Sequence, residues 1–175
     1  GNGSASCSEC SAGKHLNKTD DTCVVCAAGR FSANQNADTC SACPKGFHQP
    51  DNSSASCLPC IPGKANNGTG QAECQECPAG FVSFDQTAKN CVKCALGTYS
   101  TRAGSSSCAD CGAGQYGNAS ASAGCAPCAS GRFRPSTSMN LARCTVCPRG
   151  TTSPEGAAAC SGCDLGKYGS ADGVC

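Results

Sequence analysis

The sequence predicts small disulfide-rich repeats, arranged as an elongated tandem array of short irregular β-hairpins with essentially no helix. Three observations lead to this fold class. Cysteine accounts for 21 of the 175 residues, a share typical of disulfide-stabilised scaffolds. The cysteines recur at a nearly fixed interval, which indicates a repeat architecture. Large apolar side chains are scarce, with no tryptophan and one methionine, so a single core of ordinary size cannot form.

The period is set by ten C-x-x-C pairs, and six of the nine intervals between successive pairs are 17 residues long. We call the second cysteine of a pair the opening cysteine of a repeat and the next cysteine its closing cysteine. We predict one continuous array over 1–175 and expect it to be part of a longer chain. Its repeats are 10–23, 26–40, 43–57, 60–74, 77–91, 94–108, 111–125, 128–144, 147–160 and 163–175.

A glycine stands three residues after the opening cysteine in all ten repeats. Such regularity within one chain indicates a backbone with positive φ, or a neighbour too close to admit a Cβ atom. We predict a tight turn there. These glycines are Gly13, Gly29, Gly46, Gly63, Gly80, Gly97, Gly114, Gly131, Gly150 and Gly166.

Two residues after the glycine, seven of the ten repeats carry a planar ring, and both histidines of the chain are in this set. A histidine pair could bind metal or exchange protons. The shared position instead favours rings that pack on a neighbouring disulfide or on the next ring. The ten residues are His15, Phe31, His48, Ala65, Val82, Tyr99, Tyr116, Phe133, Thr152 and Tyr168.

Each loop then continues through residues drawn mainly from Ser, Thr, Asn, Asp, Gly and Ala before it returns to a cysteine. This composition is typical of turns, so each repeat is expected to form one hairpin with strands of two to four residues. A closed loop of about 15 residues contributes ~3 kcal/mol, which offsets the ordering of only about two residues. Packing between consecutive repeats must therefore supply the rest.

Three kinds of chemistry could use the C-x-x-C pairs. Paired C-x-x-C motifs can bind zinc inside cells, and a thioredoxin-like thiol needs a helix N-terminus in an α/β fold. The composition opposes both interpretations, and we expect no metal site and no catalytic residue. Structural disulfides are the third possibility and the one that we favour.

Sequence alone does not fix disulfide connectivity. A crossed pattern would give 34-residue modules joined by unbridged linkers, whereas the uniform period favours a forward scheme. This scheme leaves Cys7 unpaired or bonded to another chain. The forward pairs are Cys10–Cys23, Cys26–Cys40, Cys43–Cys57, Cys60–Cys74, Cys77–Cys91, Cys94–Cys108, Cys111–Cys125, Cys128–Cys144, Cys147–Cys160 and Cys163–Cys175.

The chain also contains five N-x-Ser/Thr sequons, at Asn2, Asn17, Asn52, Asn67 and Asn118. The last four fall in the middle of loops, far from the cysteines, where a bulky glycan can stand in solvent. We expect covalent N-linked glycans and no other cofactor. Many cysteines together with sequons indicate an extracellular or cell-surface location.

The segments CALGTYSTRAGSSSCADC, CGAGQYGNASASAGCAPC and CPAGFVSFDQTAKNCVKC resemble the ephrin-receptor-like cysteine-rich repeat, which is related in style to the domains of tumour-necrosis-factor receptors. The resemblance covers the whole chain and rests on its Cys and Gly positions. It implies an extracellular array of small β-hairpin units. Ala65, Val82 and Thr152 depart from it because they lack the ring. It implies no particular ligand.

Two functions fit these features. The first is a structural component of a glycosylated extracellular rod, fibre or appendage, whose partners are copies of itself or neighbouring repeats. The alternative is a ligand-binding or adhesive ectodomain of a receptor. Regularity favours the first, since a binding site normally breaks the pattern. The loop with Arg132, Arg134, Pro135 and Arg143, close to Arg149, is the candidate break, and a solvated tip is the simpler interpretation.

Other classes are excluded by the same features. The net charge is +1 and no run of like charges occurs, which opposes binding to nucleic acid or to anionic membranes. No apolar run approaches the ~20 residues that span a bilayer, so we expect no membrane insertion of this segment. No catalytic set stands outside the repeating pattern, and we expect neither an enzyme nor a small-molecule substrate.

Overall fold

The computed structural model describes residues 9–136, 142–168 and 175. The chain divides into two compact units. Unit 1 comprises Gly1–Glu76 and Ser83–Cys91, and unit 2 comprises Cys77–Val82 and Val92–Cys175.

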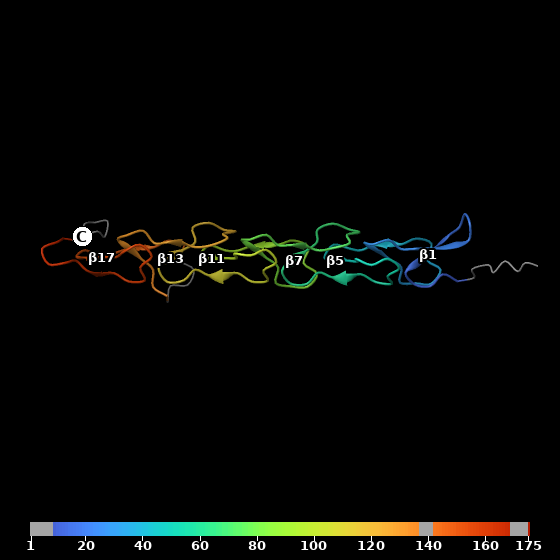
Figure 1. The fold of residues 1–175 in the computed structure, drawn as a ribbon, viewed down its shortest axis with the longest axis horizontal. Coiled ribbons are helices and arrows are strands. Elements are labelled where there is room, and N and C mark those ends of the chain that lie inside the picture. The colour runs from blue at the N-terminus through green and yellow to red at the C-terminus, as the bar shows by residue number, and fades with distance from the viewer. Residues whose placement is uncertain (1–8, 137–141, 169–174) are drawn as a thin grey trace, which may run out of the picture. The chain divides into compact units, whose positions relative to one another are not determined.

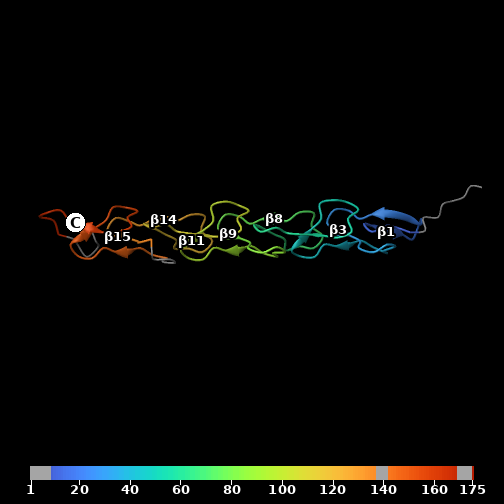
Figure 2. The same cartoon turned by 90° about the horizontal axis from the view of Figure 1, so that it is seen from below.

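The described residues form antiparallel two-stranded hairpins and no helix, which confirms the predicted class of small disulfide-rich hairpin repeats (Figure 1). Each sheet has two strands, and most strands have two residues. Figure 2 shows the same short strands from a second side. The hairpins are β1 (Lys14–Asn17) with β2 (Thr22–Val25), β3 (Arg30–Phe31) with β4 (Ser41–Ala42), β5 (Phe47–His48) with β6 (Leu58–Pro59), β7 (Lys64–Ala65) with β8 (Gln75–Glu76), β9 (Phe81–Val82) with β10 (Val92–Lys93), β11 (Thr98–Tyr99) with β12 (Ala109–Asp110), β13 (Gln115–Tyr116) with β14 (Ala126–Pro127), β15 (Arg132–Phe133) with β16 (Thr145–Val146), and β17 (Thr151–Thr152) with β18 (Ser161–Gly162).

The two residues between the cysteines of a pair form the second strand of each hairpin or, in the first hairpin, lie within it. Ala109 and Asp110, for example, lie between Cys108 and Cys111 and pair with Tyr99 and Thr98. A spacer that forms a strand is held by the ladder as well as by the two neighbouring disulfides. This pairing limits the freedom between successive bridges.

All ten repeat glycines have a φ between 72° and 87°. In the hairpins given above, the glycine directly precedes the first strand, in a turn closed by a backbone hydrogen bond; the amide of Thr98, for example, donates to the carbonyl of Ala95 at 3.0 Å, across Gly97. A positive φ at the third residue is the geometry of a type II turn, which glycine adopts at the least cost. The predicted tight turn is therefore present in every repeat.

The glycine amide also donates to the following repeat. Its acceptor is the carbonyl of the residue three positions after the next glycine, at 2.7–3.0 Å. The pairs within unit 1 are Gly13 to Ser32, Gly29 to Gln49, Gly46 to Asn66 and Gly63 to Ser83, and those within unit 2 are Gly80 to Ser100, Gly97 to Gly117, Gly114 to Arg134 and Gly131 to Ser153.

A second hydrogen bond joins consecutive repeats at the loop tip, which we define as the residue four positions before the closing cysteine. The tip amide donates to the carbonyl of the preceding repeat's opening cysteine at 2.8–3.1 Å. These pairs are Asn36 to Cys10, Ser53 to Cys26, Gly70 to Cys43 and Thr87 to Cys60 in unit 1, and Gly104 to Cys77, Ala121 to Cys94 and Gly156 to Cys128 in unit 2.

The repeat glycine also lies against the loop tip two repeats further on. A Cβ atom at Gly46 would collide with the carbonyl oxygen of Thr87, and one at Gly114 with that of Gly156. The same collision would occur at Gly13, Gly29 and Gly80. Both reasons that the sequence offers for the invariant glycine, positive φ and close approach, thus hold at one position.

The core of each unit consists mainly of half-cystines. Opening cysteines from Cys10 to Cys147 are buried, and the remaining buried apolar side chains among the described residues are Ala65, Cys74 and Val82. Sulfur and backbone therefore fill the interior that aliphatic side chains occupy in larger domains.

Replacement of Gly114 by alanine tests the close approach. Gly114→Ala should destabilise unit 2 by ~1–3 kcal/mol more than Gly150→Ala, because overpacking adds to the backbone strain. Both glycines have a positive φ, so alanine at either position costs roughly 1–2 kcal/mol of strain. Among the described atoms, only the first would collide with a carbonyl. Guanidinium unfolding of the disulfide-intact chain measures the free energy of unfolding of both variants. An equal loss of stability in the two variants would contradict the role given to the loop tip.

Candidate functional site

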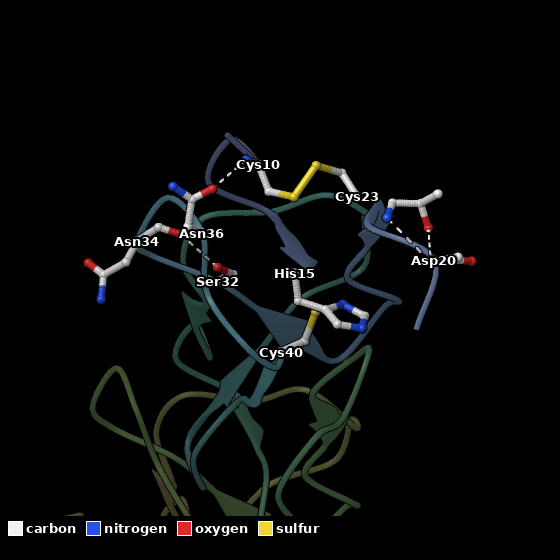
Figure 3. Close-up of a disulfide and its surroundings, with 9 residues drawn as sticks. Cys10, His15, Asp20, Cys23, Ser32, Asn34, Asn36 and Cys40 are labelled. Atoms are coloured by element: carbon white, nitrogen blue, oxygen red, sulfur yellow. Dashed lines mark hydrogen bonds between the residues drawn. A yellow bond between two sulfur atoms is a disulfide. The ribbon is translucent and has the colours of Figure 1, made fainter. Parts of the chain in front are cut away.

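The disulfides follow the order of the forward scheme. Their Cα atoms are 5.5–5.8 Å apart and their partners are 12–16 residues apart. Figure 3 shows the first of them, between Cys10 and Cys23. The others are Cys26–Cys40, Cys43–Cys57, Cys60–Cys74, Cys94–Cys108, Cys111–Cys125, Cys128–Cys144, Cys147–Cys160 and Cys163–Cys175. Cys77 and Cys91 are also disulfide-bonded. Cys7 lies outside the described residues.

Two clusters bring a histidine close to a pair of sulfurs. His15 lies near Cys26 and Cys40, and His48 near Cys60 and Cys74, with all potential ligand atoms of a cluster within 4.8 Å. Zinc binds thiolates, whereas these sulfurs are oxidised to disulfides. In this state neither cluster offers the thiolate ligands of a zinc site.

The histidines contact the disulfide of the following repeat. His15 Nδ1 lies 3.3 Å from Cys40 Sγ (Figure 3), and His48 Nδ1 lies 3.2 Å from Cys74 Sγ. Both side chains are half-buried. The ring therefore covers the next bridge, as the packing interpretation of this position expects.

A buried polar position was not recognised from the sequence. The residue three positions after the glycine is buried in eight of the described repeats. It is Gly117 in one of them and polar in the other seven, as Ser32, Gln49, Asn66, Ser83, Ser100, Arg134 and Ser153. Several of these side chains donate to the first strand of the preceding repeat: Asn66 to the carbonyl of Phe47 at 2.7 Å, Ser83 to Lys64 at 3.0 Å and Ser153 to Arg132 at 2.8 Å. The recurrence of serine at one register position was the available signal.

Arg134 occupies this position in the eighth repeat and is 2% exposed. Its Nη1 lies within hydrogen-bond distance of the carbonyls of Cys111, Gly112 and Gln115, at 2.9, 3.1 and 2.6 Å. The interpretation of this loop as a solvated tip is therefore wrong for Arg134, which binds two segments of the preceding repeat. Arg132, Arg143 and Arg149 are exposed.

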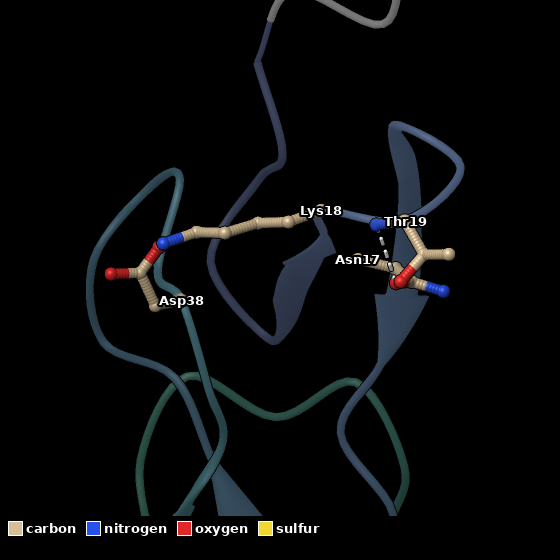
Figure 4. A network of polar contacts seen from close by, with 4 residues as sticks. All are labelled: Asn17, Lys18, Thr19 and Asp38. Carbon is tan, nitrogen blue, oxygen red and sulfur yellow. Dashed lines mark hydrogen bonds and ion pairs between the residues drawn. The ribbon is translucent and has the colours of Figure 1, made fainter.

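The sequons differ in exposure. Asn52, Asn67 and Asn118 are exposed, whereas Asn17 is half-buried at the end of β1. Asn17 Oδ1 accepts a hydrogen bond from the amide of Thr19 at 3.1 Å, and the adjacent Lys18 pairs with Asp38 at 2.8 Å (Figure 4). Asn52 Oδ1 accepts from the amide of Ala28 at 2.9 Å. Asn2 lies outside the described residues.

Comparison with known families agrees with this architecture. The family model described as tyrosine-protein kinase ephrin type A/B receptor-like matches residues 13–56, 29–70 and 80–124, which together make up more than half of the chain. The resemblance noted in the sequence is thereby confirmed. A search of curated proteins found no match. In the described part of the chain, no helix has the length and apolar character of a membrane span.

Replacement of Arg134 by methionine should destabilise unit 2 by ~2–4 kcal/mol, because buried carbonyls lose a charged donor and are left unsatisfied. Arg132→Met is the matched control, since Arg132 is exposed and surface substitutions usually change stability by less than about 0.5 kcal/mol. Chemical unfolding with the disulfides intact compares the two. A small effect at Arg134 would show that its hydrogen bonds do not support the repeat.

Proposed function

Since the chain belongs to the ephrin-receptor-like family of cysteine-rich repeats, we propose that it is a structural segment of a glycosylated extracellular rod, fibre or cell-surface appendage. The family is a non-catalytic ectodomain module, and its disulfides suit an oxidising, extracellular compartment. In this function the chain holds other parts of an assembly at a fixed spacing and catalyses no reaction.

The observation that supports the proposal is the regular set of backbone hydrogen bonds between consecutive repeats. Within each unit, both the glycine turn and the loop tip bond to a neighbouring repeat. Each hydrogen bond contributes a net ~0.5–1.5 kcal/mol, so bending at one junction would break at least two bonds and expose buried half-cystines. Such a unit resists bending at the junctions for which both bonds are described, as a spacer must.

A ligand-binding ectodomain is the second candidate. The observation that favours it is the eighth repeat, where two exposed arginines, Arg132 and Arg143, interrupt a pattern of mostly small polar residues. Charged side chains that are exposed to solvent are available to bind a partner.

The proposal includes glycans at the exposed sequons. N-glycosylation modifies the side-chain nitrogen of asparagine, so the Oδ1 atom of Asn52 can keep its hydrogen bond to Ala28. Glycans on Asn52, Asn67 and Asn118 would shield the loops from proteases and from lateral aggregation.

Deletion of single repeats distinguishes a spacer from a receptor. Removal of 43–59 or of 60–76 excises one 17-residue period and rejoins a C-x-x-C pair. Both shortened chains should fold with intact disulfides and lose equal length, because consecutive repeats use the same contacts. Small-angle scattering measures the length, and electron microscopy of the assembled material measures the spacing. Unequal losses, or isolated membrane-tethered molecules in place of fibres, would contradict the spacer function.

Occupancy of the sequons is predicted to follow exposure. Peptide mass spectrometry of the secreted chain, with enzymatic deglycosylation, should find glycans on Asn52, Asn67 and Asn118 and a lower occupancy at Asn17, whose side chain is half-buried. Asn→Gln variants at the three sites provide the control. If the chain secreted by a eukaryotic cell carried no N-linked glycan at these sites, the proposal that it is a glycoprotein would be wrong.

A further inference from the structure

Two hollows occupy the same place in different repeats. Each is lined by the residue two positions after the glycine of one repeat and by four residues of the next repeat: the one after the opening cysteine, the one after the glycine, the one before the closing cysteine, and the closing cysteine itself. Hollow A, about 270 Å³ in unit 2, is lined by Tyr116, Ala129, Arg132, Arg143 and Cys144. Hollow B, about 280 Å³ in unit 1, is lined by His48, Ile61, Lys64, Glu73 and Cys74.

The two hollows have similar volumes and different charges. Hollow A contains two guanidinium groups, and the sequence from Cys111 to Pro154 contains four arginines and no Asp or Glu. In hollow B, by contrast, Lys64 pairs with Glu76 at 3.5 Å and Glu73 adds a second carboxylate. Hollow A is therefore strongly cationic in a chain of net charge +1, and hollow B is an internal reference for the same geometry.

The backbone that carries the two arginines of hollow A is held in place by a disulfide and by hydrogen bonds. The Cys128–Cys144 disulfide joins the two ends of the eighth repeat, and Arg143 directly precedes Cys144. Arg132 lies in β15, and its Nη1 donates to the carbonyl of Cys144 at 3.4 Å. A guanidinium has five N–H donors, so this one bond leaves donors that can face a ligand. Buried Arg134 supports the same segment through its bonds to the seventh repeat.

We propose that hollow A binds the anionic group of an acidic saccharide, a sulfate ester or a carboxylate, with the sugar ring against Tyr116. Arginine binds carboxylates and tetrahedral oxyanions such as phosphate through parallel charge-assisted hydrogen bonds, and a sulfate ester offers the same arrangement of oxygens. The half-buried Tyr116 forms an aromatic wall on which the C–H face of a sugar can stack. Ligand sites commonly measure about 300–1,000 Å³, and hollow A, at about 270 Å³, lies just below this range, which suits a single charged sugar. Acidic saccharides are polyanions of the extracellular space, where this family functions.

Isothermal titration of the full disulfide-bonded chain tests the proposal at about 0.15 M salt, where exposed charges beyond ~8 Å are screened. The ligands are a heparin-derived tetrasaccharide, a hyaluronan tetrasaccharide and neutral chitotetraose. Hyaluronan carries carboxylates and no sulfate, whereas heparin carries both, so binding of heparin alone assigns the anion to sulfate and binding of both assigns it to carboxylate. Chitotetraose should not bind. A glutamate tetrapeptide provides an acidic ligand without a sugar. Binding of the peptide as tightly as either acidic saccharide would overturn the assignment to a saccharide.

Charge reversal locates the site. Arg143→Glu reproduces the residue that hollow B has at this place, and it should weaken saccharide binding by about tenfold or more, because it replaces a charge-assisted donor with a like charge. Arg149→Glu makes the same change in net charge at an exposed arginine that does not line the hollow, and it should change the affinity by less than about twofold. Equal losses in the two variants would show a nonspecific charge effect and overturn the proposal.

The role of the ring is tested by Tyr116→Thr, since threonine is tolerated at the same register position as Thr152. This variant should lose most of its saccharide affinity and keep a weak response to inorganic sulfate, which needs only the arginines. An unchanged saccharide affinity would show that the sugar does not contact Tyr116 and would overturn that part of the assignment. A near-native unfolding midpoint in each variant establishes that the repeat remains folded.

Discussion

The approach of a loop tip to the glycine turn two repeats earlier is the constraint on which the rest of each unit depends. The turn needs a positive φ to direct the chain into its strand, and the space above it is filled by the carbonyl of the distant tip. A repeat therefore contacts its next and next-but-one neighbours. This geometry recurs along both units, and in every described contact of this kind the tip lies four residues before the closing cysteine. The contact is kept when the loop is one residue shorter, as in 147–160, so the 17-residue spacing is the commonest solution and not the only one.

Such a chain achieves order without an aliphatic core. Half-cystines occupy the interior positions. The buried polar side chains beside them donate hydrogen bonds to backbone carbonyls, as Asn66 and Ser153 do. Buried polar groups are costly when unpaired, so these residues specify the register between repeats as well as stabilise it. Arg134 extends the same principle: its longer side chain reaches carbonyls on both sides of the preceding turn.

Features that repeat in the sequence could be predicted, and features that depend on contacts between repeats could not. The glycine turn, the hairpins and the family follow from spacing alone, because one residue type recurs at one position. The buried polar position was missed because its recurrent serines resemble the serines of the solvated loops, and because Gln, Asn and Arg replace them in other repeats, although several of these side chains donate to a backbone carbonyl. Arg134 was misjudged for a related reason: its neighbours Arg132 and Arg143 are solvated, and linear proximity does not show which of several arginines turns inward.

The architecture also separates residues that hold the fold from residues that are free to carry function. Positions of the cysteine, the glycine and the buried polar residue are constrained by neighbouring repeats. The residues after the glycine and before the closing cysteine face a hollow whose walls are fixed by the disulfide, so they can change charge without disturbing the ladder. Lys64 and Glu73 in one repeat and Arg132 and Arg143 in another occupy equivalent places. An array of this kind can therefore keep a constant framework and still differ from repeat to repeat in what its surface attracts.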